Sequence, residues 1–213
     1  VGHLGTLDPL AIGVLPIAVG EATKSINFIS NIKKRYSFII KWGEETDTCD
    51  LEGEVTETSN IRPDYDQISM IVSKFFVGNI EQTPPLYSAV KVNGVRAYKL
   101  ARNKEKIELK KKKINVYKFV VKKPSNKNFC KFDIICSRGT YIRSIARDLA
   151  RKLGTVGYAY EIERTEDNVF KIDNSISLER LLKLSYRELY KVHYPIEAVL
   201  SNMQEIILEK KYS

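Results

Sequence analysis

Near the start of the chain the sequence reads Gly2-His3-Leu4-Gly5-Thr6-Leu7-Asp8-Pro9-Leu10-Ala11-Ile12-Gly13-Val14-Leu15-Pro16. Three glycines and two prolines surround one carboxylate, Asp8, and most of the other residues are apolar. Because glycine and proline set the backbone conformation, this composition predicts a constrained loop that aims the Asp8 side chain. On these residues alone a simpler role is preferred, since Asp ahead of Pro commonly caps a turn or a helix.

Beyond this loop, hydrophobic spacing predicts three helices and three strands. The helices are expected over residues 20–31, 66–76 and 140–153, and the strands over 36–42, 114–121 and 129–136. The last two strands should pair as a hairpin. Strands do not alternate with helices as parallel sheets require, so we expect an α+β fold, with a mainly antiparallel mixed sheet and flanking helices.

The connections between these elements are also predicted. Residues 43–53 are acidic, rich in Thr and typical of a turn. Asn93-Gly94 indicates a tight turn of its own. Residues 196–213 begin as a helical turn and are expected to continue as a linker.

The net charge of +9 is concentrated in one part of the chain. Between residues 91 and 131 there are fifteen Lys or Arg and two Glu, so the remainder of the chain is acidic on balance. This distribution is typical of a face that binds a polyanion. The alternative is a solvated, lysine-rich loop without a partner.

Composition argues against several classes of protein. Apolar runs are too short to span a bilayer, and the first residues do not form a signal peptide. The three cysteines and two histidines have no zinc-binding spacing, so we expect no metal and reduced cysteines in a cytoplasmic protein.

The segment at residues 2–16 resembles the catalytic motif of the TruB family, bacterial synthases that isomerise uridine 55 in the T arm of tRNA. The likeness continues in the same order over nearly the whole chain. It includes Gly20-Glu21-Ala22-Thr23-Lys24, Lys34-Arg35-Tyr36, Thr46-Asp47-Thr48 with Asp50 and Gly53, Pro84-Pro85 followed by Tyr87-Ser88-Ala89-Val90-Lys91, and Cys136-Ser137-Arg138-Gly139-Thr140-Tyr141-Ile142-Arg143.

The resemblance implies a pseudouridine synthase fold and a catalytic role for three residues. Asp8 would be the essential carboxylate, which either attacks C1′ of the ribose or removes a ribose proton. Arg143 would be the cation that makes burial of this charge tolerable. Tyr36 would stack on the uracil. Without the resemblance, Arg143 would be assigned to a helix surface, and Tyr36 to the core or to the surface of a sheet. The reaction needs no cofactor.

The resemblance also implies residues that bind the substrate. Ile162 would pack against the base, and His3 would occupy space near the displaced nucleotide. Tyr87 and Lys91 belong to an RNA-clamping insertion at about residues 84–113, which is expected to move when tRNA binds. Arg164 would be a further substrate-binding residue.

Some features differ from the family pattern. Ile162-Glu163-Arg164-Thr165 stands where the family has Leu-Arg-Arg-Thr, so Glu163 reverses a charge. We expect residues 1–195 to be the catalytic domain of a protein truncated at both ends, and residues 196–213 to start the linker to a missing C-terminal RNA-binding module.

Two other functions remain open at this stage. One is the catalytic subunit of a guide-RNA-directed pseudouridine synthase, which shares the Gly-x-Leu-Asp-Pro loop. The other is a non-enzymatic RNA-binding or RNA-folding protein that uses the basic segment alone. Our expectation is a stand-alone monomer that acts on tRNA, needs no protein partner and does not bind membranes.

Overall fold

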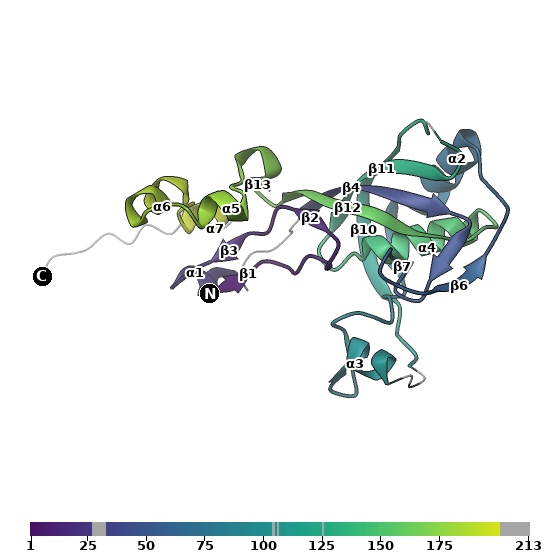
Figure 1. Cartoon of the computed structure of the whole chain (residues 1–213), viewed down its shortest axis with the longest axis horizontal. Helices are drawn as coiled ribbons and strands as arrows, with labels where there is room; N and C mark the ends of the chain where they lie inside the picture. The colour runs from purple at the N-terminus through teal and green to yellow at the C-terminus, as the bar shows by residue number, and fades with distance from the viewer. Residues whose placement is uncertain (27–32, 104, 106, 125, 201–213) are drawn as a thin grey trace, which may run out of the picture.

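One large sheet organises the molecule (Figure 1). The computed structural model describes residues 1–26, 33–103, 105, 107–124 and 126–200. Among the described residues the sheet has seven strands; β2 pairs in parallel with β12, and the other neighbouring strands pair antiparallel. The others follow the order β13 (Phe170–Lys171), β12 (Gly157–Asp167), β4 (Lys33–Trp42), β11 (Phe129–Ser137), β10 (Lys112–Val121) and β7 (Gly78–Gln82), with β2 (Ile12–Gly13) beside β12. The predicted α+β class and mainly antiparallel mixed sheet are confirmed.

Strand β4 shows why these residues form a sheet. Its even-numbered side chains, from Lys34 to Trp42, are buried, and the odd-numbered ones are exposed or half-buried. This period of two is the signature of a strand with one face on the core. Phe38 lies 5.2 Å, between ring centroids, from Phe132 on β11. Each such fully buried aromatic contributes about 1.5–3 kcal/mol of stabilisation. The predicted hairpin of β10 and β11 is confirmed.

Two helices cover the core face of the sheet. Helix α2 (Tyr65–Phe75) begins at a capping box formed by Asp64 and Gln67, which satisfies backbone N–H groups that a helix start leaves free. Helix α4 (Ile142–Lys152) buries a stripe that includes Ile145 and Leu149. Both helices join the same buried cluster as β4 and β11. Both were predicted, with ends within two residues of those observed.

Three parts of the prediction differ from the structure. Of the helix expected over 20–31, α1 covers Ala22–Ser25, and residues 27–32 lie outside the described residues. The turn expected over 43–53 contains strand β5 (Glu44–Thr46), which pairs with β6 (Val55–Thr58). Strand β12 was not predicted, because its charged residues obscure the alternation that identifies a strand.

Shorter elements lie around the sheet. Strands β1 (Gly2–His3) and β3 (Ile17–Ala18) pair with each other. The expected insertion projects from the sheet as β8 (Lys91–Val92), β9 (Val95–Arg96) and α3 (Ala97–Arg102) (Figure 1). Asn93 and Gly94 form the predicted turn, both with positive φ.

Between residues 172 and 200, the described C-terminal part forms short helices. They are the 3-10 helix η2 (Ile172–Asn174), α5 (Leu178–Leu181), α6 (Tyr186–Val192) and α7 (Glu197–Leu200). The linker expected after them falls largely on residues 201–213, outside the described residues. Within the described ranges, no helix is long and apolar enough to cross a membrane.

Candidate active site

The loop that carries Asp8 is anchored at both ends, between β1 and the short strand β2. The Leu4 amide donates to the Pro16 carbonyl (3.2 Å), and the Val14 amide donates to the Arg164 carbonyl (2.8 Å). Gly13 has a φ of +105°, and a Cβ there would lie 2.2 Å from the Arg164 carbonyl oxygen. Only glycine therefore fits this close approach to β12.

Asp8 and Arg143 form a bidentate ion pair. Arg143 Nε donates to Asp8 Oδ2 (2.9 Å), and Nη2 donates to Oδ1 (2.7 Å). The Arg143 side chain is buried, whereas that of Asp8 is 33% exposed. Two parallel charge-assisted hydrogen bonds fix the carboxylate in one orientation. The geometry therefore presents a partly open carboxylate held by a buried cation.

Arg143 makes three further contacts besides its pair with Asp8. Its Nη1 donates to the Thr48 carbonyl (3.1 Å) and lies 3.3 Å from Asp50 Oδ2. Its Nη2 also reaches the Tyr87 carbonyl (3.3 Å). The Asp8 loop, the turn after β5 and the start of the insertion therefore meet at one guanidinium on the first turn of α4. Sequence reasoning placed Asp50 in a matched motif but assigned it no role.

Tyr36 and Ile162 lie on neighbouring strands, in the main core. Tyr36 on β4 is opposite Arg164, and Ile162 on β12 is opposite Phe38, so the two side chains are on the same face of the sheet. Both are buried. Burial raises the pKa of the Tyr36 phenol well above its usual value. Tyr36 is therefore a neutral phenol at physiological pH.

Arg164, expected to bind substrate, lies buried beside the Asp8 loop. Its side chain is 1% exposed, and its guanidinium donates to carbonyl groups of the Asp8 loop and lies beside the Tyr36 hydroxyl. In this structure Arg164 therefore contacts the loop, and direct substrate binding by this side chain would require it to leave these contacts.

The other predicted substrate-binding residues lie in the insertion and on β1. Tyr87 is half-buried, with its phenol beside Asp47 and its carbonyl on Arg143. Lys91 is exposed on β8, opposite Arg96. His3 is exposed on β1, opposite Ile17.

The insertion is attached to α4 at its root. The Gln82 side-chain amide donates to the Tyr141 carbonyl (3.0 Å) and accepts from the Tyr141 amide (2.8 Å). Ser144 Oγ and Arg147 Nη2 both donate to the Thr83 carbonyl (2.8 and 2.9 Å). Burial, and next the nearby Asp8 carboxylate, raise the pKa of the Tyr141 phenol. The helix that carries Arg143 thus also holds the base of the insertion.

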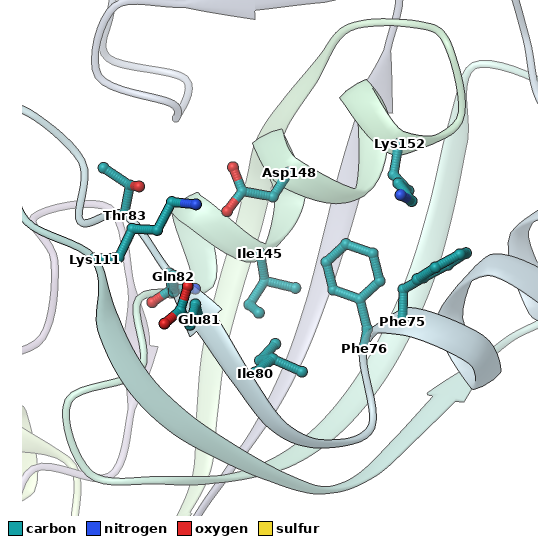
Figure 2. A pocket seen from close by; sticks show the side chains of 10 residues that line it. All are labelled: Phe75, Phe76, Ile80, Glu81, Gln82, Thr83, Lys111, Ile145, Asp148 and Lys152. Atoms are coloured by element: carbon teal, nitrogen blue, oxygen red, sulfur yellow. The ribbon is translucent and has the colours of Figure 1, made fainter.

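Two cavities lie near this region. The larger, of about 420 Å³, is lined by Phe75, Phe76, Ile80, Glu81, Gln82, Thr83, Lys111, Ile145, Asp148 and Lys152. Figure 2 shows Phe75, Phe76 and Lys152 on one side of this cavity, and Lys111, Thr83, Gln82 and Glu81 on the other, with Ile145 between them. It contains none of the three proposed catalytic residues. The smaller, of about 260 Å³, is lined in part by Ile162, Glu163 and Leu10. Among the residues that the structure describes, no group of three or more His, Cys, Asp or Glu could hold a metal ion.

Residues 1–142 match the model of the TruB family pseudouridylate synthase N-terminal domain. The chain belongs to the TruB family. It is 48% identical over 183 residues to the tRNA pseudouridine synthase B of Wolbachia pipientis, covering 85% of this chain and 52% of the relative. It is 44% identical over 209 residues to the synthase of the same name from Rhodospirillum rubrum, covering 98% of this chain and 68% of the relative. The chain therefore spans about half to two thirds of these family members.

Solved structures agree with this family assignment at the level of the fold. A chain from the crystal structure of a Cbf5-Nop10-Gar1 complex is similar with a TM-score of 0.66 and 27% identity, over 93% of this chain and 52% of that chain. A chain from an H/ACA RNP structure bound to a substrate RNA containing 2′-deoxyuridine has a TM-score of 0.64 and 22% identity, over 93% and 51%. The predicted pseudouridine synthase fold is confirmed.

Proposed function

We propose that this chain is the catalytic part of an enzyme that isomerises uridine 55 to pseudouridine in the T arm of tRNA, with Asp8 as the essential carboxylate. The observation that carries the proposal is the bidentate pair of Asp8 and Arg143. It combines an oriented carboxylate with partial exposure, which a reacting group needs. The names of the relatives give the same substrate class.

The reaction breaks the bond between uracil N1 and ribose C1′, turns the base and forms a bond between C5 and C1′. The proton on C5 is lost and N1 gains one, so the sum is an isomerisation without oxidation or reduction. Asp8 acts either as a nucleophile at C1′ or as a base toward the ribose. Both routes use the carboxylate in the orientation that Arg143 sets.

The base must leave its stack to reach Asp8, at a cost of a few kcal/mol. In our proposal the extruded uracil is bound beside Tyr36 and Ile162, which share one face of the sheet, and His3 occupies space near the displaced nucleotide. The exposed lysines of the insertion, including Lys91, contact phosphates and offset the cost of extrusion. The proposed enzyme acts as a cytoplasmic monomer, without a cofactor or a protein partner.

The test is to incubate the purified protein with a T-arm stem-loop, without guide RNA, and to map pseudouridine at the target uridine. Asp8→Asn should lower the single-turnover rate by at least about 10³-fold while RNA binding is retained. Asp66→Asn is the matched control, because Asp66 lies in the exposed first turn of α2, away from the ion pair. It should keep the wild-type rate.

Two outcomes would contradict the proposal. Retained turnover by Asp8→Asn would remove Asp8 from its role. Absence of product with the free stem-loop, but product after addition of a guide RNA and partner proteins, would favour a guide-directed enzyme. The 27% identity to a chain of a Cbf5-Nop10-Gar1 complex makes this the alternative to test.

A further inference from the structure

A second charged cluster lies buried beneath the Asp8 loop. It consists of Lys34 on β4 and Arg164 and Asp167 on β12. Lys34 Nζ is 2.8 Å from Asp167 Oδ2, and Arg164 Nε is 3.5 Å from the same oxygen. The three side chains are 6%, 1% and 0% exposed. Two cations and one carboxylate are therefore enclosed together, at a desolvation cost of several kcal/mol.

Burying this cluster costs desolvation free energy, and the contacts among its three side chains offset only part of that cost. Asp167 Oδ1 is buried and has no hydrogen-bond partner in the described part of the chain. Desolvation by burial lowers the pKa of Lys34, despite its ion pair with Asp167. An apolar pair could join β4 to β12 without these costs. The arrangement is better explained by what Arg164 does with its remaining donors.

Arg164 holds both ends of the Asp8 loop. Its Nε donates to the Val14 carbonyl (2.7 Å), and its Nη2 donates to the Gly5 carbonyl (2.9 Å). Its own carbonyl accepts from the Val14 amide (2.8 Å). The guanidinium also lies beside the Tyr36 hydroxyl. One side chain thus links the two ends of the loop to the tyrosine, and Asp167 Oδ2 lies 3.5 Å from its Nε.

We infer that Arg164, oriented by Asp167, is a positioning residue that sets the backbone of the Asp8 loop relative to Arg143 and Tyr36. This inference rests on the proposed function. Arg143 holds the carboxylate of Asp8, and Arg164 holds the peptide backbone on either side of it. The planar fork of an arginine can span two carbonyl groups at once, whereas a lysine ammonium on a flexible stem cannot fix both.

The decisive variant is Arg164→Lys, which keeps a cation beside Asp167 but loses the fork. We expect a folded protein with unchanged affinity for the T-arm stem-loop and a single-turnover rate, at saturating RNA, lowered at least tenfold. Arg62→Lys is the matched control, because Arg62 also bridges loops, with Nη1 on the Ser59 carbonyl and Nε on Asn128 Oδ1. It contacts none of the active-site residues, so its rate should equal that of the wild type.

A second variant disrupts the same contact between the Asp8 loop and Arg164 from the side of the loop. Gly13→Ala would place a Cβ against the Arg164 carbonyl and should also lower the saturated rate without lowering RNA affinity. It decides the question if Arg164→Lys does not fold. A wild-type rate in either folded variant would overturn the inference, as would a loss confined to RNA affinity in Arg164→Lys, which would return Arg164 to substrate binding. Absence of product from the wild type would instead refute the proposed function.

Discussion

The Asp8 loop and the basic insertion are attached to the same scaffold in different ways. The loop has little regular structure, yet Arg164 holds its two ends and Arg143 holds its carboxylate. The insertion has its own hairpin and helix, and it is tied to α4 at its root through Gln82 and Thr83. The proposed reacting group is thus held by buried charged residues, while the segment proposed to bind RNA extends from a short base. The proposed chemistry requires a fixed position of the carboxylate, whereas the proposed RNA binding requires a segment that extends away from the sheet.

Arg143→Gln should have the largest effect, because Arg143 holds the carboxylate of the Asp8 loop. It removes both hydrogen bonds to Asp8 and leaves the buried Asp50 without its cation. Loss of one partner from a buried pair costs about 3–5 kcal/mol, so both the melting temperature and the rate should fall. We expect a rate at least about 10³-fold lower in single-turnover assays at a temperature where the variant is folded. Arg143→Lys should lose less, and equal rates for both would contradict the bidentate role.

The insertion side can be tested through its exposed lysines. Lys91, Lys99 and Lys110 replaced together by Gln should weaken binding of the stem-loop by about tenfold, because three cations no longer neutralise phosphates. The slope of log affinity against log salt should fall by about 2, since each contact to a single strand contributes about 0.7. The single-turnover rate at saturating RNA should stay unchanged.

The control for this prediction is an equal loss of charge elsewhere. Lys171 on β13 and Lys183 and Lys191 in the C-terminal part are exposed, and their replacement by Gln should leave the salt slope nearly unchanged. Equal losses in the two triple variants would show that net charge, rather than the insertion, governs binding.

Gln82→Ala should have the smallest effect, since it weakens the attachment of the insertion to α4 but changes neither the Asp8 loop nor the lysines of the insertion. It leaves the Tyr141 backbone without two hydrogen bonds, at a cost of about 1–3 kcal/mol. We expect faster proteolysis within the insertion and a KM raised a few-fold, with kcat nearly unchanged. Glu81→Ala, at the neighbouring exposed position of β7, serves as the control. A fall in kcat with constant KM would show that the root acts on the chemistry.

Much of the fold could be predicted because its local patterns are strong. The strand-like stretches of β10 and β11, with the polar turn between them, predicted the hairpin, and the apolar stripe of α4 predicted the helix. Because strands did not alternate with helices, the α+β class followed. Strand β12 could not be found in this way. Its Arg164 and Asp167 are buried as an ion pair that exists only in the folded protein. In the sequence, two charged residues indicate an exposed segment.

In the candidate site, too, what depends on tertiary contacts could not be predicted from local sequence patterns. Asp8 and Arg143 were paired through a family resemblance, since residues 135 positions apart have no local signal. The place of Asp50 beside Arg143, and the inward direction of Arg164, depend on tertiary contacts that no spacing in the sequence reveals. The expected roles of Tyr36, Ile162, His3, Tyr87 and Lys91 remain predictions.

The close approach of Gly13 to β12 has a consequence for how this region can vary. Gly5 and Val14 are both fixed to one arginine, so the path between them has a set length. Adding or removing one residue would displace Asp8 by up to about 3.8 Å along the chain, which exceeds the length of its hydrogen bonds to Arg143. The segment can therefore exchange exposed side chains such as Leu10 more readily than it can gain or lose a residue.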